Sequence, residues 1–208
     1  MPRGASFDWH QGARATTFPA MTSDEAWQIF RDTGALLDGH FVLRSGRHSR
    51  QFFQCALALQ EMAVVEKLGA ALAEQARALN ATTVVAPAMG GLVIGQEVAR
   101  QLGARFIFVE KDEGKLTLRR GFKIGAGEKI LIVEDVITRG GRVGETIEIV
   151  RAHGGGLLGV ALVVDRSNGA VDLGVPTFSL MRMEVETFEA SDLPDDLKKI
   201  PAIHPGGK

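Results

Sequence analysis

The sequence predicts an α/β fold with a doubly wound, mainly parallel sheet. The first observation is a set of short, apolar, β-branched runs, at residues 83–86, 105–109, 129–133 and 158–164. The second is that helical patterns at residues 92–102 and 143–153 separate some of these runs. Apolar strands that alternate with helices indicate a parallel sheet covered on both faces. We therefore expect an α/β core over residues 61–183.

Composition and charge indicate one globular domain, residues 1–208, long enough for one sizeable core. The net charge of -1 and the pI near 6.5 give no overall attraction to nucleic acid or to an anionic membrane. No apolar run approaches the ~20 residues of a membrane span. The single cysteine, Cys55, fits a reducing compartment. We therefore expect a cytoplasmic protein that binds neither nucleic acid nor a membrane.

The segments outside the core are expected to form a small hood and a tail. Within residues 1–60, Thr22 and Glu25 form a capping-box pattern that predicts a helix ending at Gly34. Residues 39–58 have a strand-like pattern that predicts a hood over a site. Residues 61–80 have the three- and four-residue apolar spacing of an amphipathic helix. Residues 184–208 are expected to extend over the surface.

The most informative segment is an apolar strand followed by two acids and a glycine-containing loop. The acids, Glu134 and Asp135, are expected at the carboxyl edge of the sheet, where open α/β folds bind ligands. The loop opens a helix whose free N–H groups can bind a phosphate. Carboxylates accept hydrogen bonds from sugar hydroxyls and favour a hydrated Mg²⁺ nearby. The prediction is a ribose-5-phosphate site, against the alternative of an ordinary strand-to-helix turn; its residues are Glu134, Asp135, Val136, Ile137, Thr138, Arg139, Gly140, Gly141 and Arg142.

This segment resembles the phosphoribosyl pyrophosphate signature of the type I phosphoribosyltransferases. The resemblance implies that Glu134 and Asp135 contact the ribose hydroxyls and that residues 138–142 bind the 5′-phosphate. It also implies a Mg²⁺ cofactor held mainly through the substrate, with no direct protein ligand. The chain departs from the family at Arg142, where a small hydroxylated residue is usual. We expect Arg142 to point to solvent, and we leave the role of Arg139 open.

The hood sequence resembles the orotate-specific members of that family. The resemblance implies that Phe52 and Phe53 cover the pyrimidine, that Arg44 lies near the substrates and that Thr138 contributes to the orotate site. For the two phenylalanines, the alternative is ordinary packing in the hood core.

Arg166, at the end of a core strand, matches the family's orotate-binding arginine. A guanidinium can hold a carboxylate through two parallel hydrogen bonds, as the orotate anion requires. The alternative is a surface ion pair between Arg166 and Asp165 or another acid.

Residues 110–121 resemble a shortened form of the family's flexible catalytic loop, which in relatives reaches the active site of the neighbouring subunit. Lys111 is the first candidate and Lys115 the second for a catalytic cation over the leaving pyrophosphate. Gly90 stands where many orotate enzymes carry a lysine. The alternative for the loop is a solvated, charged hairpin. The resemblance also implies a homodimer.

The resemblance implies an enzyme that transfers a 5-phosphoribosyl group from phosphoribosyl pyrophosphate to orotate. Its products would be pyrophosphate and orotidine 5′-monophosphate, in the synthesis of UMP, with Asp135 among the catalytic residues. The alternatives are a purine or uracil phosphoribosyltransferase and a non-catalytic regulator that senses phosphoribosyl pyrophosphate. A sugar-phosphate isomerase or kinase is a further alternative, although the sequence contains no Walker motif.

Overall fold

A six-stranded sheet forms the centre of the computed structural model, which describes residues 21–43, 45–167 and 169–205. Its strand order is β5-β4-β3-β6-β7-β8, and every neighbouring pair is parallel except the β4–β5 hairpin. The prediction of a mainly parallel sheet is therefore confirmed. The strands are β3 (Thr83–Pro87), β4 (Arg105–Asp112), β5 (Lys115–Leu118), β6 (Lys129–Ile137), β7 (Gly156–Asp165) and β8 (Thr177–Arg182).

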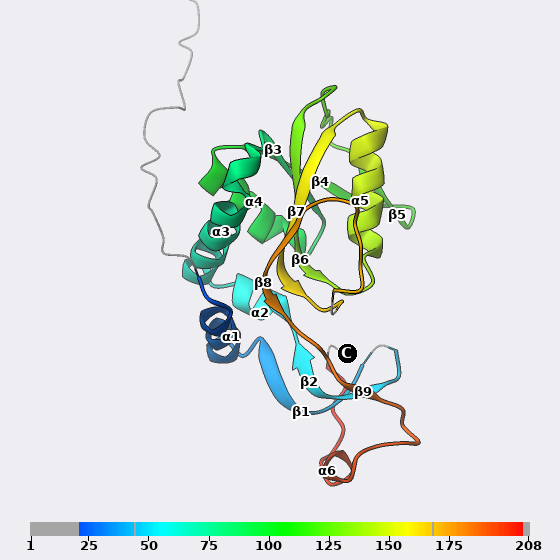
Figure 1. Cartoon of the computed structure of the whole chain (residues 1–208). Helices are drawn as coiled ribbons and strands as arrows, with labels where there is room; N and C mark the ends of the chain where they lie inside the picture. The colour runs from blue at the N-terminus through cyan, green and yellow to red at the C-terminus, as the bar shows by residue number, and fades with distance from the viewer. Residues whose placement is uncertain (1–20, 44, 168, 206–208) are drawn as a thin grey trace, which may run out of the picture.

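Helices cover both faces of this sheet, as Figure 1 shows. Helices α3 (Met62–Ala76) and α4 (Gly91–Leu102) pack on one face, and α5 (Gly141–Ala152) packs on the other. Successive strand residues point to opposite faces. In β6, Leu131 therefore joins the core under α3 and α4, whereas Ile132 joins the core under α5. Within the part of the chain that the structure describes, no helix combines the length and the apolar composition needed to span a membrane.

The hood is a separate three-stranded antiparallel sheet below the central one (Figure 1). Strands β1 (Leu36–Val42) and β2 (His48–Phe53) form a hairpin, and β9 (Thr187–Phe188) pairs with β2. Helix α1 (Ser23–Asp32) precedes the hood, and its N-cap Thr22 and Glu25 form the predicted capping box. The segment with the strand-like pattern therefore forms two of the three hood strands, and the third strand comes from the far end of the chain.

The strand-like prediction for residues 39–58 is wrong after Phe53. Residues Cys55–Leu59 form the short helix α2, which buries Cys55, Ala58 and Leu59. These three residues lie at the i, i+3 and i+4 spacing of one helical face, so burial favours a helix there. Residues 77–79 likewise leave the predicted amphipathic helix and form a short 3₁₀ turn, η1 (Arg77–Leu79).

The tail does more than extend over the surface. Besides β9, it forms the short helix α6 (Asp195–Lys198), and ion pairs attach it to the hood. Arg47 pairs with Glu189 at 2.9 Å, and Arg50 pairs with Asp196 at 2.8 Å. The tail therefore completes the hood and holds its hairpin, although the proposed division at residues 60 and 183 stays a prediction.

Candidate active site

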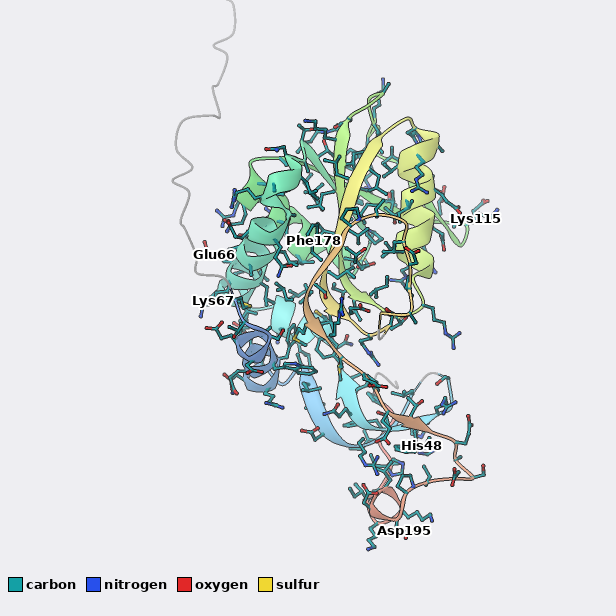
Figure 2. The ribbon with its side chains drawn as sticks, viewed as in Figure 1. His48, Glu66, Lys67, Lys115, Phe178 and Asp195 are labelled. Carbon is teal, nitrogen blue, oxygen red and sulfur yellow. The ribbon has the colours of Figure 1, made fainter. Side chains whose placement is uncertain are left out.

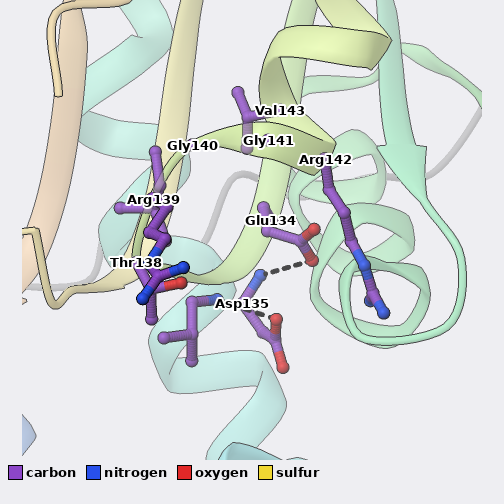
Figure 3. Close-up of a pocket in the computed structure, with 10 residues that line it drawn as sticks. Glu134, Asp135, Thr138, Arg139, Gly140, Gly141, Arg142 and Val143 are labelled. Carbon is purple, nitrogen blue, oxygen red and sulfur yellow. Dashed lines mark hydrogen bonds between the residues drawn. The ribbon is translucent and has the colours of Figure 1, made fainter. Parts of the chain in front are cut away.

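The cavity that contains the two acids lies at the carboxyl end of β6 (Figure 3). It has a volume of about 360 Å³. All the sequence-predicted sugar-phosphate residues line it: Glu134, Asp135, Val136, Ile137, Thr138, Arg139, Gly140, Gly141 and Arg142, together with Val143. The strand delivers the acids, and the loop then turns into α5, so one continuous segment forms the cavity wall.

The acidic pair differs sharply in environment. Glu134 is only 3% exposed, and its Oε1 accepts a hydrogen bond of 3.1 Å from the backbone N–H of Asp135. Burial, followed by the neighbouring charge of Asp135, raises the pKa of Glu134 to about 9. Asp135 is partly exposed, and its Oδ1 accepts from the backbone N–H of Val136 at 2.7 Å. Burial therefore favours the neutral form of Glu134 in the free protein.

The start of α5 has the geometry of a phosphate loop. Gly140 has φ of 77°, and a Cβ at this position would lie 2.7 Å from Val171 Cγ1. Glycine is therefore required both by the backbone conformation and by the close approach of the loop that follows β7. Thr138, Arg139 and Gly141 are exposed or half-exposed at the cavity. The first N–H groups of a helix have no acceptor within the helix, so they are free to bind an anion.

A second helix start faces the same acids. A Cβ at Gly90, the N-cap residue of α4, would lie 2.6 Å from Asp135 Oδ1 and 2.8 Å from Oδ2. A Cβ at Gly91 would lie 2.9 Å from the backbone oxygen of Val133. The carboxylate of Asp135 therefore lies directly against a backbone that has no side chain. The sequence shows glycine instead of lysine at position 90, but nothing in the Gly-Gly pair indicated its contact with Asp135.

Arg166 follows β7, and its backbone N–H donates to the oxygen of Ile137 at 2.9 Å, which places it beside the end of β6. Its Nε is buried and has no hydrogen-bond partner among the residues that the structure describes, and burial lowers the pKa of the guanidinium. The neighbouring Asp165 accepts instead from the N–H and the hydroxyl of Ser167, at 2.8 and 2.6 Å. The alternative ion pair between Arg166 and Asp165 is therefore not formed.

The two hood phenylalanines point in opposite directions because they are consecutive residues of β2. Phe53 is 6% exposed, and its ring centroid lies 4.9 Å from that of Phe30 on α1. Phe52 is partly exposed and packs against Phe41 with a centroid distance of 5.7 Å. Phe53 thus belongs to the core beneath the hood, and only Phe52 keeps an accessible ring. Arg44 lies outside the residues that the structure describes.

The structure does not bring Lys111 and Lys115 to the cavity of their own chain. Both are exposed residues of the β4–β5 hairpin, and Figure 2 shows Lys115 at the outer side of α5. The backbone N–H of Leu116 donates to Glu145 Oε2 on α5 at 3.3 Å. The hairpin is therefore docked along the outer side of this helix.

Arg142 is exposed, as expected, but it also lines the cavity. Figure 3 shows its guanidinium level with the two carboxylates, on the side opposite Arg139. Its positive charge lowers the pKa of Glu134 and so offsets part of the rise that burial causes.

A phosphate loop and an acidic pair at the carboxyl edge of a parallel sheet define the class of this protein as a sugar-phosphate-binding α/β protein. Residues 57–188 match the family described as the phosphoribosyl transferase domain. The chain is 50% identical over 188 residues to an orotate phosphoribosyltransferase of Pelotomaculum thermopropionicum, a match that covers 90% of this chain and 99% of the relative. It is 47% identical to that of Desulforamulus reducens, over 90% of this chain and 98% of the relative. The chain belongs to the phosphoribosyltransferase family and, within it, to the orotate phosphoribosyltransferases.

Solved structures show the same fold at low sequence identity. The orotate phosphoribosyltransferase of Aeropyrum pernix superposes with a TM-score of 0.64 at 24% identity, over 75% of this chain and 92% of that one. The adenine phosphoribosyltransferase of Thermoanaerobacter pseudethanolicus gives 0.57 at 19% identity, over 64% and 88% of the two chains. Because enzymes for different bases share the fold, the fold alone does not select the base.

Proposed function

We propose that this protein transfers the 5-phosphoribosyl group of phosphoribosyl pyrophosphate to orotate and releases pyrophosphate. The observation that carries the proposal is the joint wall that Glu134, Asp135 and the start of α5 form around one cavity. A carboxylate pair and a set of free N–H groups at this spacing suit the hydroxyls and the phosphate of one pentose. The names of the relatives at 50% and 47% identity support orotate as the base.

In this proposal, each part of the site positions one part of the substrates. Glu134 and Asp135 accept hydrogen bonds from the ribose hydroxyls, and residues 138–142 hold the 5′-phosphate. Arg166 holds the carboxylate of orotate, since its guanidinium pairs with no acid among residues 21–43, 45–167 and 169–205. Phe52 supplies an apolar face for the ring. A ring nitrogen of orotate then bonds to C1 of the ribose as the bond from C1 to pyrophosphate breaks, and the proton of that nitrogen passes to solvent.

The donor set of the cavity fits Mg²⁺. Its two carboxylates are hard oxygen donors, whereas the described part of the chain contains no cluster of three or more His, Cys, Asp or Glu side chains suited to a metal ion. This set supports an ion held together with the substrate, near Asp135, rather than in a cage of protein ligands. When bound there, Mg²⁺ supplies charge neutralisation for the leaving pyrophosphate.

We further propose a cytoplasmic homodimer in which the β4–β5 hairpin serves the neighbouring subunit. Neither Lys111 nor Lys115 lines the cavity of its own chain, so a catalytic role requires a second chain or a movement of the hairpin. Mixing an Asp135→Asn chain with a Lys111→Ala chain tests this. Each variant alone should be nearly inactive, and a mixed dimer should regain activity at one of its two sites.

The decisive experiment measures pyrophosphate release from phosphoribosyl pyrophosphate with orotate, adenine, hypoxanthine or uracil, with and without Mg²⁺. Turnover is expected only with orotate and Mg²⁺, and Asp135→Asn should reduce it at least tenfold. Turnover with another base and none with orotate would overturn the base assignment. Tight binding of the activated sugar without turnover of any base would favour a regulator.

A further inference from the structure

A side chain at position 90 would collide with Asp135 in its present position. A Cβ on Gly90 would lie within 2.8 Å of all three atoms of the Asp135 carboxylate. Real Cβ atoms do not approach other atoms so closely, so any side chain there would displace the acid. A positive charge for the pyrophosphate must therefore come from another element.

Two arginines of residues 110–121 already have acid partners. Arg119 pairs with Asp112 and Arg120 pairs with Glu110, both at 2.9 Å. Arg166 lies at the end of β7, where the base is proposed to bind. Arg142 makes no ion pair with any described residue, and it lines the cavity.

The position of Arg142 separates it from the phosphate loop that carries it. Its Cα lies in the first turn of α5, but its side chain extends past the loop to the level of the carboxylates (Figure 3). Arg139 lies on the other side of the acids in the same view. If the acids hold the ribose hydroxyls and the helix start holds the 5′-phosphate, the guanidinium of Arg142 lies alongside the sugar rather than beyond the phosphate.

We propose that Arg142 binds the pyrophosphate group of the substrate, and that Gly90 and Arg142 together replace a cation at position 90. The inference rests on the proposed function. A guanidinium can hold two phosphate oxygens through parallel hydrogen bonds, and it cannot lose its proton near neutral pH. Negative charge grows on the pyrophosphate as its bond to C1 breaks, so Arg142 stabilises the transition state as well as the bound substrate.

The experiment compares ligands that carry the 5′-phosphate, the pyrophosphate or both groups. Binding of phosphoribosyl pyrophosphate, Mg²⁺-pyrophosphate and ribose 5-phosphate is measured by calorimetry for the wild type, Arg142→Ala and Arg142→Lys. Arg151→Ala is the matched control, because it removes the same charge from the exposed far end of the same helix. Thermal unfolding verifies that each variant is folded.

Arg142→Ala is expected to weaken phosphoribosyl pyrophosphate and pyrophosphate at least tenfold and to change ribose 5-phosphate less than twofold. Arg142→Lys should recover part of the loss, and Arg151→Ala should change nothing. Weaker binding of phosphoribosyl pyrophosphate and ribose 5-phosphate, with Mg²⁺-pyrophosphate unchanged, would assign Arg142 to the 5′-phosphate and overturn the proposal. Equal weakening of all three ligands, or no change in any of them, would overturn it as well. Binding is measured without turnover, so this result can be interpreted even if the protein proves to use a base other than orotate.

Discussion

Replacing Arg166 with methionine is expected to stabilise the free protein while it removes the use of orotate. Within the described part of the chain, the Nε of Arg166 is buried without a hydrogen-bond partner, and burial lowers the pKa of its guanidinium. The free protein therefore carries the cost of a charge whose proposed partner is the substrate. Methionine keeps most of the length of the side chain and removes the unpaired donor and the charge.

The size of both effects follows from this environment. A buried donor without a partner costs about 1–3 kcal/mol, and we take the lower part, about 1–2 kcal/mol, because the residue is only half-buried. For a chain of this length that gain raises Tm by about 2–8 °C. Loss of two charge-assisted hydrogen bonds to the orotate carboxylate costs about 3 kcal/mol or more, which is over a hundredfold in affinity.

The assay pairs thermal unfolding of the free protein with the KM of orotate. Arg182→Met is the matched control, because Arg182 is 75% exposed at the end of the neighbouring strand and its Nε lies 4.0 Å from Asp165. It should change stability by less than about 0.5 kcal/mol. A lower Tm for Arg166→Met, or an unchanged KM for orotate, would refute the reasoning that its partner is the substrate.

Three further predictions concern the site and the hood. Gly140→Ala forces a residue into φ of 77° and brings its Cβ to 2.7 Å from Val171, so urea unfolding should show a loss of about 1–2 kcal/mol or more. Gly141→Ala, whose Cβ meets nothing within 4 Å, should cost much less, and an equal loss would contradict the argument. The pKa of Glu134 in the folded protein is raised to about 9. Its contribution to the unfolding free energy is therefore complete below the ordinary pKa of 4.5 and is lost as pH rises toward 9. In the wild type, the unfolding free energy should therefore fall by at most about 1.4 kcal/mol per pH unit between those two pH values. Glu134→Gln should remove this fall, and identical pH profiles for the two proteins would exclude the pKa shift. Phe53→Ala should cost about 3–5 kcal/mol in unfolding free energy, whereas a small loss would mean that the ring is not core.

Local sequence patterns predicted an element correctly wherever the interactions that form it are local. The apolar runs predicted β3, β4, β6 and β7 because a strand covered on both faces must be apolar throughout. Thr22 and Glu25 predicted the start of α1 because both hydrogen bonds of a capping box join residues three apart. The acids and the phosphate loop were also predicted, since one continuous segment contains them all.

Strand β8 was not predicted, because an edge strand is only half covered and Thr177–Arg182 mixes polar and apolar residues. The third strand of the hood was missed for a related reason. Strand β9 has two residues, and it exists only because the tail returns to pair with β2, where Ser49 pairs with Thr187 and His48 pairs with Phe188. Such pairing depends on contacts between distant segments, which no local pattern encodes.

The sequence by itself determined the class of fold, the acidic pair and the glycine-containing loop that follows it, because neighbouring residues along one strand and one helix start create them. Only the tertiary structure decided which side chains share a space. It set the carboxylate of Asp135 against Gly90, turned Phe53 into the core and Phe52 away from it, and gave Arg166 no acid partner among residues 21–43, 45–167 and 169–205. Those outcomes depend on packing between elements that are far apart in the chain, and packing is decided only when the whole core closes.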